Sequence, residues 1–211
     1  MSRIRNIIFD LGGVLLHLNM KKTNEEFTAL GVKDFEKYFT MVHADPLFKR
    51  LETGKVGNEF YEGVRKTTSI KASDEQIDAA WNAMLLDFSE EAVRKLQQLS
   101  WKYHLFLFSN TNAIHHAFFQ KAFRKQFGFD MDLLFEKAWY SHVAGHRKPD
   151  LTAFEYIIKD SGVDPRETVF IDDTLPNVET ARKAGLKAAH LTPPKTVVEL
   201  LDELLSEAAK S

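Results

Sequence analysis

Four short segments of the chain carry side chains suited to holding a divalent cation and a phosphate group. Asp10 follows one apolar run, and the pair Asp172-Asp173 follows another. Carboxylate oxygens of this kind are ligands that magnesium prefers. Ser109-Asn110 adds a hydroxyl and amide donors, and Lys148 adds a point charge that a phosphate or an acidic cluster can hold. Together these segments predict phosphoryl-transfer chemistry.

In such chemistry one oxygen of Asp10 attacks phosphorus in line and forms an aspartyl phosphate, which water then cleaves. Donors at Ser109-Asn110 stabilise the charge that collects on the phosphoryl oxygens. Taken singly, each segment also has a structural explanation: Asp10 as a turn or helix cap, Ser109-Asn110 as a helix start, and Lys148 as a solvated lysine. Because these explanations would all have to hold together, the joint pattern favours a functional site.

The chemistry-bearing residues lie where strands are expected to end. Short apolar runs alternate with longer segments of helical period, which is typical of an α/β fold with a parallel sheet and crossover helices. In such sheets, ligands bind beyond the carboxyl ends of the strands. The expected strands are Asn6–Phe9, Leu105–Phe108, Lys137–Tyr140, Thr168–Ile171 and Ala188–Leu191. Further helices are expected at Leu151–Lys159, from about Pro176 to Gly185, and at Val197–Leu205.

The stretch between the first two strands is too long for a simple crossover. About 90 residues separate Phe9 from Leu105, whereas a crossover needs a dozen or more. We therefore expect a catalytic core formed by residues 1–16 and 103–211, and an α-helical cap of residues 17–102 that lies over the carboxyl ends of the strands. The helices expected in this stretch are Lys21–Leu30, Asp34–Phe39, Asn58–Lys66, Ser73–Phe88 and Glu90–Trp101.

Composition restricts the class of protein. The 211 residues are 44% hydrophobic and carry a net charge of −2, so we expect no nucleic-acid partner. No apolar run reaches the ~18 residues of a membrane span, and no membrane partner is expected. The absence of cysteine excludes disulfides, thiolate nucleophiles and zinc–thiolate sites. With no signal-peptide pattern at the N-terminus, we expect a cytoplasmic protein that is a monomer or a weak homodimer.

Four segments, in this order, resemble the motifs of the haloacid dehalogenase (HAD) superfamily. The resemblance covers nearly the whole chain and implies a Rossmann-like core with an α-helical cap inserted after the first motif. The first segment is closest to a bacterial branch that includes sugar-1-phosphate phosphatases. The segments are Asp10-Leu11-Gly12-Gly13-Val14, Ser109-Asn110-Thr111-Asn112, Arg147-Lys148-Pro149-Asp150, and Phe170-Ile171-Asp172-Asp173 with Asn177.

The resemblance also implies roles for individual residues. Asp10 would be the nucleophile and Lys148 the charge stabiliser, with Mg²⁺ as the cofactor and a small phosphorylated metabolite, most simply a sugar phosphate, as the substrate. The implied phosphate-binding residues are Ser109, Asn110, Lys148 and Gly12, and the implied metal ligands are Asp10, the backbone carbonyl of Gly12, Asp173 and, in support, Asp172.

Gly12 departs from the usual family pattern. Phosphatases of the superfamily usually carry at this position a second aspartate, which protonates the leaving group. Loss of a positioned acid costs ~10²–10⁴-fold in rate. We therefore expect a preference for esters whose leaving group needs little help, such as anomeric sugar phosphates, acyl or aryl phosphates and pyrophosphate, and we do not expect phosphomutase chemistry. His17 lies near enough to replace the acid, but we interpret it as a linker histidine without a proton role.

Residues of the cap are expected to contact the non-phosphate half of the substrate. The candidates are Glu52-Thr53-Gly54 and Trp81-Asn82, although the Ile77–Trp81–Leu85 spacing favours Trp81 as a core residue.

Three alternatives remain at this stage. A metal-independent 2-haloacid dehalogenase would use Asp10 on carbon, but it has no use for the acids Asp172-Asp173. A phosphorylation-switch receiver domain has similar groups in a different order along the chain. A catalytically weak module that binds a phosphorylated ligand, with Gly12 marking decayed activity, stays open. The prediction is a magnesium-dependent phosphomonoester hydrolase.

Overall fold

The computed structural model describes residues 3–38, 46–55, 57 and 59–209. At its centre lies a five-stranded parallel sheet of order β5-β4-β1-β6-β7. Strand β1 pairs with β4 on one side and β6 on the other, so that Ile8 lies opposite both Phe106 and Phe170. The strands are β1 (Asn6–Phe9), β4 (His104–Ser109), β5 (Lys137–Tyr140), β6 (Thr168–Asp172) and β7 (Lys187–His190). The predicted α/β fold with a Rossmann-like parallel sheet is confirmed.

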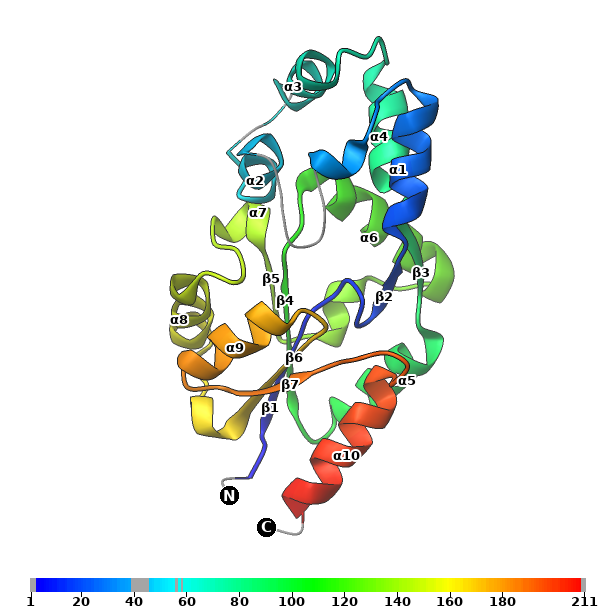
Figure 1. The fold of residues 1–211 in the computed structure, drawn as a ribbon. Coiled ribbons are helices and arrows are strands. Elements are labelled where there is room, and N and C mark those ends of the chain that lie inside the picture. Colours follow the sequence, from blue (N-terminus) through cyan, green and yellow to red (C-terminus); the bar gives the residue numbers. More distant parts are fainter. Residues whose placement is uncertain (1–2, 39–45, 56, 58, 210–211) are drawn as a thin grey trace.

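Helices cover both faces of the sheet (Figure 1). Because side chains alternate along a strand, Ile7 and Phe9 pack against one helical layer and Ile8 against the other. The first layer holds α5 (Glu90–Leu99), α6 (Ala113–Phe127) and α10 (Val197–Ala209), and the second holds α8 (Leu151–Ser161) and α9 (Leu175–Lys183). Short helices occupy the connections: η2 (Met131–Leu134), α7 (Ser141–Ala144) and η3 (Pro165–Glu167). None of the helices within the described ranges is both long and apolar enough to cross a membrane.

A second group of helices lies beyond the carboxyl ends of the strands, at the top of Figure 1. It has its own apolar core, in which Phe27 and Phe35 stack with ring centroids 4.1 Å apart and Trp81 is fully buried. We refer to this group as the cap. Its elements are α1 (Met20–Ala29), η1 (Phe35–Lys37), α2 (Pro46–Glu52), α3 (Glu59–Thr68) and α4 (Asp74–Asn82).

Two helix predictions in this region need correction. The helix expected over Ser73–Phe88 ends at Asn82, and β3 (Leu85–Phe88) pairs antiparallel with β2 (Leu16–Leu18). A short apolar run fits either a helix or a strand, and pairing with a distant segment decided the outcome. The helix expected at Asp34–Phe39 is one 3₁₀ turn, η1, in the described residues; Phe39 lies outside them, as does Asn58.

Helix α5 packs on the sheet rather than in the cap. Its side chains Ala92, Val93 and Leu96 belong to the same buried cluster as Ile7. At its surface Lys95 pairs with Asp202 of α10. We therefore propose that the cap comprises the residues between β2 and β3, which is shorter than the 17–102 expected from the sequence.

Candidate active site

Three of the expected acids meet at one edge of the sheet. Asp10 follows β1, and its N–H donates to the carbonyl of Ile171 in β6 at 2.9 Å. Asp172 ends β6 and Asp173 follows it. Each of the three offers a carboxylate oxygen, and these oxygens all lie within 4.8 Å of one another. The adjacency of β1 and β6 in the sheet therefore brings together residues that are more than 160 positions apart.

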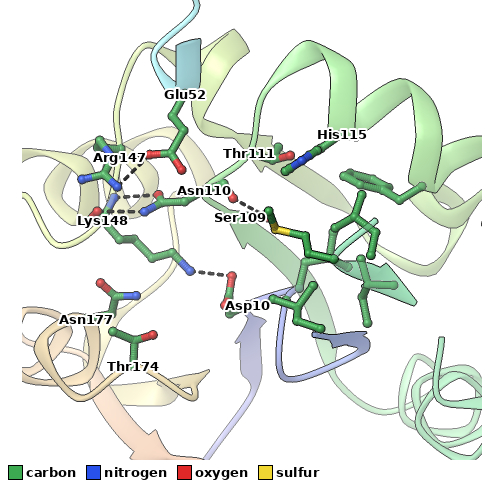
Figure 2. Close-up of a pocket in the computed structure, with 17 residues that line it drawn as sticks. Asp10, Glu52, Ser109, Asn110, Thr111, His115, Arg147, Lys148, Thr174 and Asn177 are labelled. Carbon is green, nitrogen blue, oxygen red and sulfur yellow. Dashed lines mark hydrogen bonds and ion pairs between the residues drawn. The ribbon is translucent and has the colours of Figure 1, made fainter. Parts of the chain in front are cut away.

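Lys148 reaches the same point from the loop before α8 (Figure 2). Its Nζ lies 2.6 Å from Asp10 Oδ1 and 2.7 Å from Asp172 Oδ2. The lysine is 1% exposed, and its Nζ lies 5.3 Å from the ring centroids of both Phe108 and Phe170. These rings close the space around the ammonium group, so the two carboxylates are the anions that compensate it.

Asn110 fixes the backbone that carries this lysine. Its side-chain Nδ2 donates to the Lys148 carbonyl at 2.8 Å, and its Oδ1 accepts from the Lys148 N–H at 2.9 Å. The side-chain amide is thus engaged, and the backbone N–H is the donor that we propose Asn110 offers to phosphate. Ser109 is buried at the end of β4, and its hydroxyl makes one long bond of 3.5 Å to the Asn110 carbonyl. We propose that this hydroxyl turns to a bound phosphate.

The charges of the cluster are unbalanced. Burial raises the pKa of Asp10 to about 7; Lys148 opposes this shift, and Asp172 and Asp173 add to it. Burial also raises the pKa of Asp173, with the charge of Asp172 as the second cause. Burial alone would lower the pKa of Lys148, but Asp10 and Asp172 hold it above its ordinary value. When all are ionised, three carboxylates and one ammonium leave two excess negative charges, which suits a divalent cation.

The two acids of the pair are held differently. Asp172 is fully buried, and it accepts from Asn177 Nδ2 at 3.0 Å on both oxygens and from the Thr174 N–H at 2.8 Å. Asp173 is only half-buried, and the Thr174 hydroxyl donates to it at 3.2 Å. Asp172 is therefore fixed as a partner of Lys148, while Asp173 is free to take a further ligand.

Gly13 adopts a conformation and a contact that only glycine permits. Its φ is +75°, and a Cβ at this position would lie 2.0 Å from Asp173 Oδ2. We expect Gly13→Ala to displace the Asp173 carboxylate and to weaken magnesium binding at least tenfold, measured by calorimetric titration. Gly31→Ala is the matched control, since Gly31 also has a positive φ (+98°) but nothing within 4 Å of the added methyl. Both variants carry the backbone strain of about 1–2 kcal/mol, so equal magnesium affinities in the two would contradict the prediction.

Neither Gly12 nor His17 provides a proton donor. A Cβ on Gly12 would lie 2.8 Å from Leu18 Cδ1, so Leu18 occupies the direction in which an aspartate would project. His17 is exposed and lies 3.5 Å from Asp87, and it does not line the pocket that surrounds Asp10 and Lys148 (Figure 2).

His115 does line this pocket, but its Nε2 is engaged by the Trp81 carbonyl at 3.0 Å, and burial lowers its pKa to about 4. His115 is therefore neutral at pH 7.

Of the expected cap contacts, Glu52 alone lines the pocket around Asp10. Trp81 packs in the core of the cap, as its spacing indicated, and Asn82 lines a different hollow beside α6. Sequence reasoning missed the partner of Glu52, Arg147, whose position next to Lys148 was the available signal. It also missed an apolar wall formed by Leu16, Leu18, Met84, Leu85 and Phe119.

The chain is similar to known hydrolases over most of its length. A family model described as haloacid dehalogenase-like hydrolase matches residues 4–185. A D-ribitol-5-phosphate phosphatase from Bacteroides thetaiotaomicron is 31% identical over 188 residues, which cover 87% of this chain and 90% of that protein. A sesquiterpene phosphatase from Aspergillus oryzae is 28% identical over 195 residues, 88% of each chain.

Solved structures of similar proteins share the fold closely. A HAD family enzyme from Bacteroides thetaiotaomicron, an aspartate-to-alanine mutant in complex with magnesium and inorganic phosphate, is 34% identical with a TM-score of 0.89, over 94% of this chain and 98% of that one. A protein from Porphyromonas gingivalis described as a predicted HAD-like family hydrolase is 34% identical with a TM-score of 0.87, over 97% of this chain and 98% of that one. The chain therefore belongs to the haloacid dehalogenase-like hydrolases, as its four motifs indicated.

Proposed function

We propose that the protein is a magnesium-dependent phosphomonoester hydrolase that acts through an aspartyl phosphate on a small phosphorylated metabolite, in particular a sugar phosphate. The main support is the convergence of Asp10, Lys148 and the acid pair on one point of the pocket. The relatives add support, because both are phosphatases and one similar structure holds magnesium and phosphate.

In the proposed reaction an oxygen of Asp10 attacks phosphorus in line, and the bond between phosphorus and the ester oxygen breaks. Lys148, which lies within 2.7 Å of Asp10 and Asp172 in the structure, offsets the charge around the reacting group. The Ser109 hydroxyl and the Asn110 N–H donate to the phosphoryl oxygens. The leaving oxygen takes its proton from water, since Gly12 supplies none. Water then opens the aspartyl phosphate and releases inorganic phosphate.

The described residues fit a magnesium ion. Three carboxylates of different burial lie close together, and hard oxygen ligands of this type are what magnesium prefers. We propose that Asp10, Asp173 and the backbone carbonyl of Gly12 hold the ion, with Asp172 in support. When bound, the ion would neutralise the carboxylates and draw negative charge from the phosphate.

Magnesium should therefore stabilise the folded protein. At a concentration of about 100 times its Kd, a ligand of the native state adds about 2.7 kcal/mol to the free energy of unfolding. We expect thermal melting with magnesium to show this gain in the wild type and a much smaller one in Asp173→Asn. Without magnesium, Asp173→Asn should melt no lower than the wild type, because it removes a repulsive carboxylate. An equal magnesium shift in both proteins would exclude Asp173 as a ligand.

Hydrolysis of p-nitrophenyl phosphate tests the function directly. We expect turnover that requires magnesium and stops when EDTA is added. Release of halide from a 2-haloacid without metal would instead support the dehalogenase alternative. Saturable binding of phosphate without turnover of any ester would support the non-catalytic alternative.

The remaining expectations concern partners and location. A phosphorylated small molecule is the proposed substrate, and the net charge of −2 gives no reason to expect nucleic acid. A cytoplasmic location and a monomeric or weakly dimeric state stay predictions, and size-exclusion chromatography with light scattering tests the second.

A further inference from the structure

Among the described residues of the cap, one ionisable side chain lines the pocket. Glu52, at the end of α2, is 7% exposed and accepts from Arg147 at 3.0 Å (Nε) and 2.7 Å (Nη2). Both donors reach the same oxygen, Oε2, and the other oxygen, Oε1, has no donor among the residues that the structure describes. Figure 2 shows Glu52 pointing from the cap into the pocket, above Asn110 and Lys148. One carboxylate oxygen of this largely buried side chain is thus available to a ligand in the pocket.

The position of this oxygen relative to the proposed phosphate site is informative. Glu52 belongs to the cap, whereas Asp10 and Lys148 belong to the core, and all three line the same pocket. A phosphate held at Asp10 therefore leaves the organic half of the ester facing Glu52. Arg147 adjoins Lys148 in the chain, so its ion pair also ties the cap to the loop that carries the lysine.

The charges of the pocket define which organic groups fit. Arg147 is paired with Glu52, and Lys148 with Asp10 and Asp172. Both of these lining cations are therefore already paired with carboxylates, and neither has an uncompensated positive charge for a second anionic group. A carboxylate or second phosphate on the substrate would instead meet the charge of Glu52, and like charges placed together are strongly unfavourable.

The wall of Leu16, Leu18, Met84, Leu85 and Phe119 completes the pocket. A surface of this kind receives C–H groups rather than ions. The organic half of the ester therefore faces a hydrogen-bond acceptor and an apolar wall. An uncharged, hydroxylated ring or chain satisfies both.

We infer that Glu52 determines substrate specificity by accepting a hydrogen bond at Oε1 from a hydroxyl of an uncharged organic group, and that the enzyme excludes esters with a second anionic group. This inference rests on the proposed phosphatase function. A hydrogen bond from a hydroxyl to a charged acceptor contributes about 10- to 100-fold in binding, and that factor is what the experiment should detect.

The test compares three monophosphate esters with the magnesium-loaded protein. A hexose 1-phosphate is neutral and hydroxylated apart from its phosphate, a hexuronic acid 1-phosphate adds one carboxylate, and phenyl phosphate has a ring without hydroxyls. Each is assayed for kcat/KM with the wild type, Glu52→Gln and Glu52→Ala. The control is Glu62→Gln, the same change at an exposed position of the cap helix α3.

We expect the wild type to prefer the hexose 1-phosphate over the hexuronic acid 1-phosphate at least tenfold. Glu52→Gln should lower the ratio of kcat/KM for the hexose 1-phosphate to that for the hexuronic acid 1-phosphate about tenfold, because the repulsive charge of Glu52 is gone. Glu52→Ala should lower kcat/KM for the hexose 1-phosphate about 10- to 100-fold more than for phenyl phosphate. The control Glu62→Gln should keep the wild-type preferences. If Glu52→Ala fails to fold, the near-isosteric Glu52→Gln still decides the matter.

The outcomes separate the two proposals. An equal fall for all three esters would show that the ion pair only supports the structure, and it would overturn the specificity role. Equal wild-type use of the two sugar esters would overturn it as well. Both results leave the phosphatase proposal standing. If the wild type turns over neither these esters nor p-nitrophenyl phosphate, the proposed function fails and the inference fails with it.

Discussion

Replacing Asp10 with asparagine is expected to lower kcat for p-nitrophenyl phosphate by about 10⁴-fold or more, a loss typical of a residue on which the whole reaction depends. The amide oxygen can still accept from Lys148, so the arrangement at 2.6 Å need not change. The amide cannot, however, form the aspartyl phosphate.

Stability should not account for this loss of activity. Because burial raises the pKa of Asp10, the charge of Asp10 is unfavourable in the folded protein, and its removal should leave the melting temperature in EDTA equal or higher. Asp87→Asn is the control, since Asp87 is exposed beside His17. Retention of more than a few per cent of the wild-type rate by a pure Asp10→Asn preparation would contradict the nucleophile role.

Detection of the aspartyl phosphate intermediate is a second test of Asp10 as the nucleophile. Wild-type protein quenched with acid during turnover should carry one phosphoryl group on the peptide that contains Asp10, as read by mass spectrometry. The Asp10→Asn protein should carry none. A phosphoryl group on Ser109 instead would show that Ser109, and not Asp10, is the nucleophile.

The sheet could be predicted from the sequence because its central strands are buried on both faces. Ile7, Ile8 and Phe9 are all fully buried, and such strands appear as continuous apolar runs. The bounds of β1 and β5 match the expected ones. Strand β6 extends one residue further than expected, because Asp172 is polar and still pairs with β7. Strand β4 is one residue longer at each end, and β7 is shifted by one residue towards the N-terminus.

The errors arose where distant segments decide the structure. Leu85–Phe88 forms a strand only because Leu16–Leu18 is there to pair with it. Thr23 supports the same junction, since its hydroxyl accepts from the Met84 N–H at 3.0 Å across 61 residues. Local periodicity contains no information about either contact. The expected helix over this segment was therefore wrong in its last third.

The candidate site shows the same division. Asp10, Ser109 and Asp172 lie at the carboxyl ends of parallel strands, where ligands bind in such sheets. Their convergence could therefore be predicted from the sequence alone. The pairing of Arg147 with Glu52 joins residues 95 positions apart in two different parts of the fold. It depends on how the cap lies over the core, which no sequence pattern specifies.

Lys148→Met is expected to lower the free energy of unfolding by about 3–5 kcal/mol at pH 8 in EDTA, the usual cost of removing one partner from a buried ion pair. Lys148 is 1% exposed and lies within 2.7 Å of two carboxylates, Asp10 and Asp172. Methionine fills a similar volume but leaves these two buried charges without a cation. Lys121→Met, at an exposed position of α6, is the control and should change stability by no more than about 0.5 kcal/mol.

The pH dependence identifies the cause of this loss. Burial already raises the pKa of Asp10, and Lys148 is the group that opposes the rise; without it, the pKa should rise further. A carboxyl whose pKa is higher in the folded than in the unfolded state binds more protons when folded, so stability increases as the pH falls from the folded pKa towards its ordinary value. Urea denaturation should therefore show a smaller loss in the free energy of unfolding of Lys148→Met at pH 5 than at pH 8.

Magnesium should restore part of the stability of Lys148→Met at pH 8, because it supplies positive charge to the same carboxylates, but it should not restore the activity. A deficit that is the same at both pH values and indifferent to magnesium would mean that lost packing, rather than uncompensated charge, makes Lys148 necessary.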